Sequence, residues 1–442
     1  MNRVLISLLT VLLAGSAVAE DWPIPPVNLP HPLGNNWGNY QDYGGGGYFH
    51  NGIDVITPDS SGAEVRAVAH GWVKGWGTIS ADLHWRLAIS DSPVSFTGRA
   101  PGWLYAHIDK DRWHLQEGDE VDAGDLIGYL VAWPIDATFD HCHFARISDT
   151  GAYWNRFPNY TWWFIQNPLT IISPNTDLEA PVFENARSGG RRFAFCRNNS
   201  STYQSETGLT GAVDIIAKVY DKTGYPTGDP EWDKLAPFKL EHMIRRDDGL
   251  VVRDWTLSLS FAGRLDDAAI HVVYKNDYTC NSRGDYNNRD YYYVITNTDG
   301  DSIIESSDAS GHWNTAGVGD GNYWVIVRAW DVYGNSTTDS MLVTTSNGVG
   351  VEDLPPLALS SPLRVSPNPG RGPARISFGT GRQVNASLKL LDATGRVVAD
   401  FVRGRLMPGD HSYTRQGLKA GVYYVRLSID GRDYSRKLVL TE

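Results

Sequence analysis

The sequence contains few cysteines, few methionines and no excess of basic residues. Its 442 residues include 3 cysteines and 4 methionines. The 39 Lys and Arg are outnumbered by 51 Asp and Glu, which gives a formal net charge of −12. An acidic chain of this kind repels nucleic-acid phosphates, so we expect no nucleic-acid partner. Beyond the N-terminus, apolar runs long enough to span a bilayer are also lacking, so we expect no transmembrane segment.

Turn-forming and aromatic residues are abundant instead. The chain has 45 glycines, 23 prolines and 22 tyrosines. They separate short alternating or apolar runs such as GIDVITP, HWRLAIS, GWLYAHI and NYWVIVRAW, and no amphipathic stretch of helical length stands out. Short runs between Gly, Pro and Asp turns are typical of β-strands. We therefore predict an all-β protein with several domains.

The N-terminus has the features of an export signal. Arg3 precedes an apolar run that ends in the small-residue pattern Ala17-Val18-Ala19. The run is shorter than the ~20 residues that a membrane-spanning helix needs, and no basic stop-transfer sequence follows it. We therefore predict a cleaved secretory signal peptide over residues 1–19, which directs the protein out of the cytoplasm.

Export to an oxidising compartment permits a disulfide bond, and three cysteines allow at most one pair. Cys196 and Cys280 lie within what reads as one domain, whereas Cys142 lies between two histidines in another. We therefore expect a Cys196–Cys280 disulfide. The alternative is a pair of buried, unpaired thiols.

Composition divides the rest of the chain. Residues 20–172 hold 8 of the 12 histidines, which suggests a site in this region. Residues 180–346 have strand-like runs without such a cluster. Their ending, GDGNYWVIVRAWDVYGNS, resembles the last hairpin of immunoglobulin-like modules in secreted bacterial proteins, so we predict an immunoglobulin-like β-sandwich there. Residues 347–362 are small, polar and punctuated by proline, which is typical of a linker.

The last part, residues 363–442, carries different motifs. It opens with SPNP, has a hairpin at DATGR, continues with LKAGVYYVRL and ends in a basic KLVL segment. Over its whole length it resembles the C-terminal sorting domain of type IX secretion substrates. The resemblance implies a small β-sandwich, with the type IX secretion machinery as a partner. It also implies a protein that passes through the periplasm and is secreted or held at the outer-membrane surface.

Three fragments of residues 20–172 contain residues that could carry chemistry: HNGID at 50–54, YAH at 105–107 and HCH at 141–143. Successive side chains of a strand alternate between its faces. His141 and His143 are therefore expected on one face, where they offer two imidazoles to one site. Cys142 is expected in the opposite layer, as a buried apolar residue.

The spacing of His50 and Asp54 also favours a common site. Gly52 permits a tight turn between them, so both side chains can face one point. Two imidazoles and one carboxylate, with a fourth position left to water, would form a zinc site of the catalytic type. Hydrolysis also needs a proton acceptor and a group that steadies the tetrahedral oxyanion. His107 and His141 remain for these tasks.

These motifs, together with AEVRAVAHGWV and EGDEVDAGDLIGYL, resemble those of the lysostaphin-type zinc endopeptidases over residues 45–148. That family has the LytM-like fold of antiparallel β-sheets. The resemblance implies Zn²⁺ as the cofactor. The implied metal ligands are His50, Asp54 and His143, and the implied catalytic pair is His107 and His141, with the division of roles between the two left open.

The chain departs from the family pattern next to the last motif. Where the family usually has a Gly-rich stretch this chain has WPIDATFD, and Ala145 stands where the family has Glu. We therefore expect a differently shaped cleft wall beside His141. Trp103, Trp113 and Trp133 could line this groove or belong to the core.

Taken together, the motifs predict an exported zinc metalloendopeptidase that uses a zinc-bound water to hydrolyse peptide bonds. Peptidoglycan peptide cross-links or Gly-rich proteins are the implied substrates. The alternative is a non-catalytic LytM-like module that binds cell wall or partner proteins, although degenerate members usually lack ligands and none is lacking here. An adhesin built of β-modules would explain the last two domains but not the His and Asp set.

Overall fold

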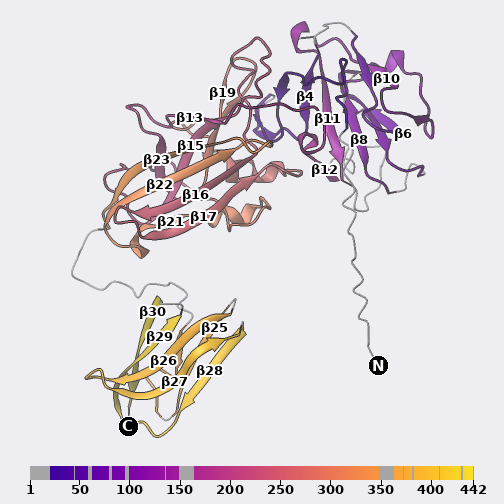
Figure 1. Cartoon of the computed structure of the whole chain (residues 1–442). Coiled ribbons are helices and arrows are strands. Elements are labelled where there is room, and N and C mark those ends of the chain that lie inside the picture. Colours follow the sequence, from indigo (N-terminus) through magenta and orange to yellow (C-terminus); the bar gives the residue numbers. More distant parts are fainter. Residues whose placement is uncertain are drawn as a thin grey trace, which may run out of the picture. The chain divides into compact units, whose positions relative to one another are not determined.

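In the computed structural model the chain forms two compact units, residues 1–348 and 349–442. The residues described are 20–43, 45–57, 62–78, 82–94, 99–134, 136–148, 164–347, 363–371, 373–380, 383–407, 409–429 and 432–441. Strands dominate both units (Figure 1), so the predicted all-β class is confirmed. The predicted signal peptide and residues 348–362 of the predicted linker lie outside the described residues.

The first part of unit 1 is built on one large antiparallel sheet. Its strands lie in the order β1-β4-β11-β8-β7-β6-β9, and β12 pairs with β11. The bounds of these strands are β1 Leu33–Asn35, β4 Ile53–Ile56, β6 Gly71–Thr78, β7 Trp85–Ser90, β8 Gly102–Ala106, β9 Glu120–Val121, β11 His141–Ile147 and β12 Ile165–Gln166. Two short pairs join strands β2 Tyr40–Gln41 with β3 Tyr48–Phe49 and β5 Glu64–Arg66 with β10 Leu126–Tyr129.

The central strands of this sheet are buried on both faces. Tyr105 on β8 and Phe144 on β11 belong to one apolar cluster, which comes almost entirely from residues before 173. Their neighbours Leu104 and Ala145 belong to a second cluster, which includes many residues of the 180–346 region. The alternation of strand side chains explains this division, because each strand serves two layers at once.

Residues 180–346 form a β-sandwich of the predicted immunoglobulin-like kind. The strands of its five-stranded sheet are β13 Val182–Glu184, β14 Phe193–Arg197, β15 Ala212–Tyr220, β20 Tyr292–Val294 and β21 Trp313–Asn314. The strands of its four-stranded sheet are β16 Lys239–Arg246, β17 Val251–Ser260, β22 Gly321–Trp330 and β23 Ser336–Thr345. Strands β18 Arg283–Gly284 and β19 Arg289–Asp290 form a separate pair. Val213 of β15 and Val325 of β22 share one apolar cluster, so the two sheets enclose a common core.

Helices are short throughout the described residues. The α-helix α1 spans Ile270–Val273. The 3-10 helices are η1 Asp82–His84, η2 Lys110–Arg112, η3 Ala137–Phe139, η5 Pro168–Thr170, η6 Asp267–Ala269, η7 Ser306–Ser310 and η8 Thr315–Gly317. None of the helices in the described part of the chain has the length and apolar character that crossing a bilayer requires.

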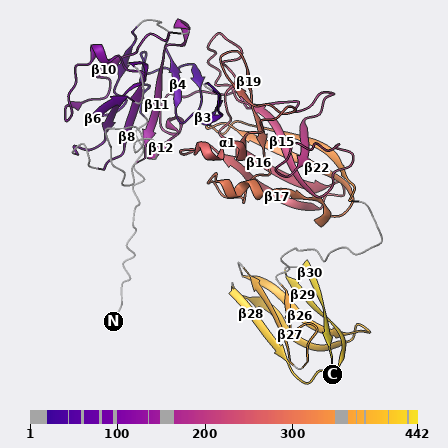
Figure 2. The same ribbon diagram turned by 180° about the vertical axis from the view of Figure 1, so that it is seen from behind.

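Hydrogen bonds join the 180–346 region to the first sheet region. The side-chain amide of Asn51 donates to the Leu265 carbonyl at 3.0 Å, and the Leu265 amide donates back to Asn51 Oδ1 at 2.7 Å. The Phe49 amide donates to Asp267 Oδ1 at 2.9 Å. Helix η6, which contains Asp267, therefore lies beside β3. Figure 2 shows α1, which follows η6 in the chain, next to β3. The regions predicted as two domains, 20–172 and 180–346, share one compact unit and one apolar cluster.

The cysteines do not form the predicted disulfide. Cys142, Cys196 and Cys280 are all buried free thiols. Cys196 and Cys280 lie in the same small apolar cluster, and Cys280 Sγ donates to the Ala186 carbonyl at 3.9 Å. Burial raises the pKa of both thiols, so they are held in the protonated form. The prediction of a Cys196–Cys280 bond is therefore wrong for this structure, in which apolar packing stabilises the pair.

Three buried carboxylates gather at one place, two of them in the 180–346 region and the third, Asp177, just before it. Asp177, Asp221 and Asp331 are 5%, 4% and 3% exposed, and Asn335 Nδ2 donates both to the Asp177 carbonyl and to Asp331 Oδ2. Asp221 Oδ1 has no hydrogen-bond partner within the described ranges. Burial, with the negative charges of Asp331 and Asp177, raises the pKa of Asp221 well above its usual range. Burial likewise raises the pKa of Asp177 to about 7.

Replacing Asp221 with asparagine is expected to raise the free energy of unfolding at pH 8. Above about pH 4 the buried Asp221 must either take up a proton or carry a charge next to Asp331 and Asp177, and asparagine removes this cost. A raised pKa means that the folded chain holds a proton that the unfolded chain releases above about pH 4, so the gain should shrink as the pH falls toward 4. Urea unfolding at both pH values, with the exposed Asp254→Asn as control, checks this. An equal effect of Asp221→Asn at pH 8 and pH 4 would contradict it.

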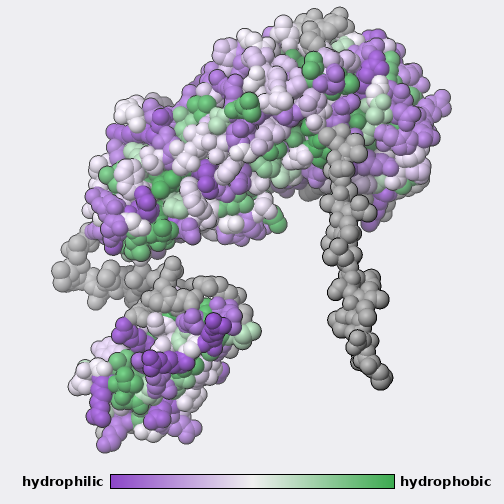
Figure 3. Space-filling model, viewed as in Figure 1, coloured by the Kyte–Doolittle hydropathy of each residue, from purple (hydrophilic) through white to green (hydrophobic). Residues whose placement is uncertain are grey.

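The second unit is a small β-sandwich of two antiparallel sheets. The three-stranded sheet contains β24 Arg364–Ser366, β25 Ala374–Thr380 and β28 Gly409–Arg415. The four-stranded sheet contains β26 Val384–Asp392, β27 Val397–Leu406, β29 Gly421–Ile429 and β30 Arg432–Leu440. Its core includes Ile376, Leu388, Val425 and Leu438. On the face drawn in Figure 3, apolar residues of both units occur in small groups among polar ones, as expected when each unit buries its own core.

Candidate metal and catalytic site

His50 and Asp54 approach each other across the short connection between β3 and β4. His50 follows β3 directly, and Asp54 is the second residue of β4. A Cβ added at Gly52 would lie 2.3 Å from both Cε1 and Nε2 of His143. The φ of Gly52 is not in the left-handed region. Gly52 is therefore needed for the close approach of the His143 ring, and not for the backbone freedom that the sequence suggested.

Strand β11 brings His141 and His143 to the same site. Its register with β4 pairs His143 with Asp54 and Cys142 with Val55. His141 and His143 line one cleft, whereas the Cys142 side chain is fully buried in the apolar cluster on the other face. The alternation predicted for the HCH motif is thus present.

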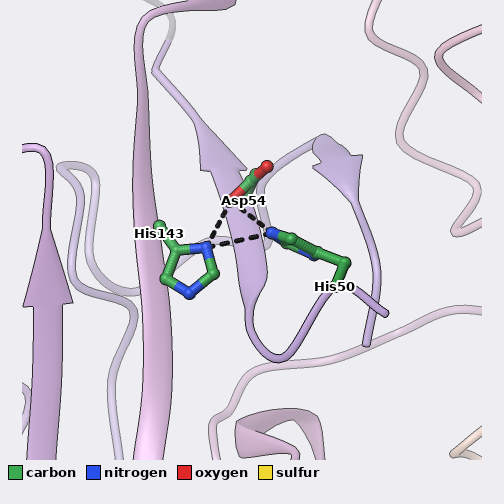
Figure 4. Close-up of side chains that lie close together, drawn as sticks. All are labelled: His50, Asp54 and His143. Carbon is green, nitrogen blue, oxygen red and sulfur yellow. Dashed lines mark hydrogen bonds and ion pairs between the residues drawn. The ribbon is translucent and has the colours of Figure 1, made fainter. Parts of the chain in front are cut away.

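Three side-chain atoms converge at this point (Figure 4). His50 Nε2 lies 3.1 Å from Asp54 Oδ1 and 2.9 Å from His143 Nδ1, and His143 Nδ1 lies 3.0 Å from Asp54 Oδ1. All three residues are buried, with side-chain atoms close enough to share one metal ion. The structure therefore brings together the three residues predicted as metal ligands.

Neighbouring groups orient two of these side chains. His50 Nδ1 donates to the Asn36 carbonyl at 3.1 Å, so its Nε2 presents a lone pair to the site. Asn35 Nδ2 donates to Asp54 Oδ2 at 2.7 Å, which leaves Oδ1 facing the histidines. Burial alone would raise the pKa of Asp54, but His50 and His141 hold it well below its usual range. The site therefore offers an ionised carboxylate, as a metal requires.

This donor set fits Zn²⁺. Imidazole nitrogens and carboxylate oxygens bind zinc at about 2.0–2.1 Å, so two ligands of a tetrahedral ion lie ~3.4 Å apart. The three separations here, from 2.9 to 3.1 Å, are within a few tenths of an ångström of that value. Hydrogen bonds to the outer atoms of His50 and Asp54 are the second layer of contacts that zinc ligands usually have. Three protein ligands leave one position for water, as catalytic zinc sites do.

Gly52→Ala is expected to weaken metal binding while the fold is kept. The new Cβ would collide with the His143 ring, and misorienting a ligand typically costs about 10-fold to 100-fold in metal affinity. Gly46→Ala is the matched control, because a Cβ there meets nothing within 4 Å. Chelator competition measures both affinities. Equal affinities for the two variants would show that the close approach at Gly52 does not matter.

His107 and His141 lie beside the three ligands. Their ring centroids are 4.5 Å apart, and His141 Nε2 is 3.7 Å from Asp54 Oδ1. His141 Nδ1 donates to the Phe139 carbonyl and His107 Nδ1 donates to the Leu83 carbonyl, each at 2.7 Å. Because a carbonyl only accepts, the proton of each neutral ring is on Nδ1 and the lone pair is on Nε2. Both candidate catalytic residues are thus oriented as proton acceptors.

His107 also has an unusual backbone conformation. Its φ is 65°, in the left-handed region that side chains other than glycine rarely adopt. Strain of this kind is concentrated at functional sites, where the surrounding structure holds it in place. Burial, together with His141 and His143, holds the pKa of His107 well below its usual range, so the ring is neutral at pH 7.

Trp133 packs against this pair. Its ring centroid lies 4.9 Å from that of His107 and 4.7 Å from that of His141. Trp133 therefore lines the cleft. The sequence alone did not decide whether Trp133 lines the groove or belongs to the core. Of the other two tryptophans considered, Trp103 is fully buried in the core and Trp113 packs against it.

The site opens into a cleft of about 830 Å³. The lining residues to which the sequence assigned no role include Tyr43, His84, Arg86, Arg264, Asp267 and Tyr286. Burial lowers the pKa of Arg86 to about 9, and it also lowers the pKa of His84. For Arg86 the alternation of HWRLAIS was a usable signal, because Arg86 is the second residue of β7. His84 ends the 3-10 helix η1, to which strand alternation does not apply. Arg264 and Tyr286 are far from the motifs in sequence, so no local pattern pointed to them.

One comparison with known proteins identifies the second unit. Residues 364–441 match the family model described as a secretion system C-terminal sorting domain. This part of the chain is a type IX secretion sorting domain. The resemblance inferred from SPNP, DATGR and the basic end is therefore confirmed. The sorting domain indicates export to the cell surface or into the medium. It also implies that the type IX secretion machinery is a partner of this protein.

No curated protein matches the sequence. Among solved structures, a tetra-tandem repeat from the extending region of a large adhesion protein is 11% identical, covering 86% of this chain and 70% of its own, with a TM-score of 0.17. The SGBP-B protein of a Bacteroides ovatus mixed-linkage glucan utilization locus is 12% identical, with coverages of 56% and 60% and a TM-score of 0.15. The BSP domain of a biofilm-associated protein is 9% identical, with coverages of 85% and 66% and a TM-score of 0.15. At such TM-scores these similarities carry no argument.

Proposed function

We propose that the chain is an exported zinc metalloendopeptidase that hydrolyses peptide bonds. The observation that carries this proposal is the convergence of His50, Asp54 and His143, with three ligand atoms 2.9–3.1 Å apart, beside the buried pair His107 and His141. Resemblance to the lysostaphin-type endopeptidases supports peptidoglycan peptide cross-links or Gly-rich proteins as the substrate class.

Three residues of the site would bind the metal, and two others would transfer protons. His50, Asp54 and His143 would hold Zn²⁺, which supplies an activated water and polarises the scissile carbonyl. His141 and His107 each direct Nε2 toward the site, because their Nδ1 atoms donate to backbone carbonyls. Between them they accept the proton of the attacking water and return it, stabilising the tetrahedral oxyanion and protonating the leaving amine. Trp133 packs against both rings.

The sorting domain sets where this chemistry would occur. An enzyme carried across the outer membrane acts outside the cell that makes it. Its substrate would then be the wall of another organism or an extracellular protein.

Metal analysis of the purified mature chain, together with hydrolysis of purified peptidoglycan and of a Gly-rich peptide, tests the proposal. One zinc per chain and the appearance of new amino termini are expected. Zinc without hydrolysis would favour the alternative of a wall-binding or partner-binding module. A chain that takes up no zinc at micromolar concentration would overturn the proposal.

A further inference from the structure

A hairpin of the 180–346 region reaches the cleft that holds the candidate site. Strands β18 and β19 form this hairpin, and Tyr286, in the turn between them, lines the cleft. The resemblance to the endopeptidases covers residues 45–148 only. A part that Tyr286 plays at the site is therefore a feature of this chain and is not carried over from the family.

The turn that carries Tyr286 is held by hydrogen bonds from its own region. Asp285 Oδ1 accepts the amides of Asn287 and Asn288, at 2.7 and 2.8 Å. Trp232 Nε1 donates to the Tyr286 carbonyl at 3.1 Å. The turn is therefore closed on itself and is also tied to a second loop of the 180–346 region.

The hairpin also packs closely on strand β2 of the first sheet region. A Cβ added at Gly284 would lie 1.6 Å from the carbonyl oxygen of Tyr40, so the two backbones are in direct contact. The Gly284 amide donates to Asp42 Oδ1 at 3.4 Å. Glycine is the residue that permits such a close approach of two backbones. The place of Tyr286 relative to the candidate site is therefore set by contact between backbones.

Tyr286 is joined to the candidate catalytic pair through Trp133. Trp133 Nε1 donates to the Tyr286 hydroxyl at 3.2 Å. The N–H is the only polar group of an indole, so this bond satisfies it and favours one orientation of the ring. The same ring packs against His107 and His141, with interplanar angles of 78° and 65°. The Tyr286 hydroxyl therefore orients the ring that both imidazoles contact.

The two imidazoles need such a support because each has one backbone hydrogen bond, through Nδ1. Hydrogen bonds to a carbonyl oxygen tolerate a broad range of directions, so this bond leaves the ring free to tilt. The packed Trp133 ring limits the tilt. Proton transfer requires heavy atoms about 2.6–3.2 Å apart, and a misplacement of about 1 Å can cost roughly 10²-fold in rate. The orientation of Trp133 should therefore affect turnover more than substrate binding.

We infer that Tyr286 is a positioning residue of the candidate site, through which the 180–346 region orients Trp133 against His107 and His141. The inference rests on the proposed function for its reaction and concerns what holds the two histidines in place. The sandwich then contributes to catalysis itself and is not a separate module attached to the first sheet region.

The test uses Tyr286→Phe, Trp133→Phe and the double variant in the mature full-length chain, with a soluble peptidoglycan peptide dimer and pentaglycine as substrates. Tyr286→Phe keeps the ring and removes the hydroxyl that accepts the indole N–H. Its kcat should fall roughly threefold to tenfold, the range of one hydrogen bond, with KM and zinc content unchanged. In the Trp133→Phe background, which has no indole donor, the same change should have no further effect. The control Tyr278→Phe alters a fully exposed tyrosine of the same region, outside the cleft, and should leave kcat unchanged.

The outcomes separate the inference from the proposed function. An unchanged kcat in Tyr286→Phe, or an equal further loss in the Trp133→Phe background, overturns the inference while peptidase activity stands. If the parent chain cleaves neither peptide, the proposed function fails, and NMR of the His107 and His141 rings decides whether Tyr286 positions them. Ring signals that shift in Tyr286→Phe, but not when the same change is made in the Trp133→Phe background, support the inference. Ring signals that stay unchanged in Tyr286→Phe overturn it.

Discussion

Alanine at His50, Asp54 or His143 is expected to remove Zn²⁺ and hydrolytic activity together. Each change leaves two of three ligands, and a two-ligand site loses most of its affinity. Metal content by mass spectrometry and hydrolysis of purified peptidoglycan measure the two losses on the same preparation.

His70→Ala is the matched control for these three variants. His70 is an exposed histidine of the same region, paired with Asp122 and outside the cleft, so its loss should change neither zinc content nor rate. Thermal unfolding of each variant shows whether the fold is kept. Full zinc occupancy in all three ligand variants would refute the ligand assignment.

His107→Ala and His141→Ala are expected to keep zinc and lose turnover. Neither residue belongs to the trio whose ligand atoms converge, yet both lie beside it with Nε2 lone pairs oriented by backbone carbonyls. General acid–base help is typically worth about 10²–10⁴-fold, so kcat should fall by that amount while KM changes little. Zinc analysis and steady-state kinetics on the two variants, beside His70→Ala, provide the comparison.

A different result for one of the two histidines would be informative. If either variant keeps a rate within about twofold of the parent, that histidine has no part in proton transfer. If either variant loses zinc, it acts on the ligands instead, and the role proposed for it is wrong.

Local sequence patterns predicted the centre of the site because short-range geometry determines it. The alternation of a strand was enough to place His141 and His143 together and Cys142 in the core. The i, i+4 spacing of His50 and Asp54 was enough to bring them to one point. The sequence did not predict the role of Gly52 correctly. Gly52 matters because the His143 ring of β11 lies close to its Cα. That ring is far away in sequence, so no local pattern indicates the contact.

The parts that the sequence did not predict depend on packing between distant segments. Arg264 and Tyr286 reach the cleft because the 180–346 region docks on the ligand loop, and docking depends on the shapes of two whole surfaces. The predicted Cys196–Cys280 disulfide failed for a related reason. The oxidising compartment and the number of cysteines favoured a disulfide bond. In the structure the two thiols are free and pack in an apolar cluster instead.

The shared apolar cluster limits how this protein could have been assembled during evolution. Leu104, Ala145 and Ile147 of the first sheet pack in the same cluster as Val213 and Val325 of the sandwich. A gene fragment that encoded residues 20–172 alone would expose that face to water, so it would not be a transferable cassette in the way that the sorting domain is. Recombination is therefore expected to keep the first sheet region and the sandwich together as one inherited block.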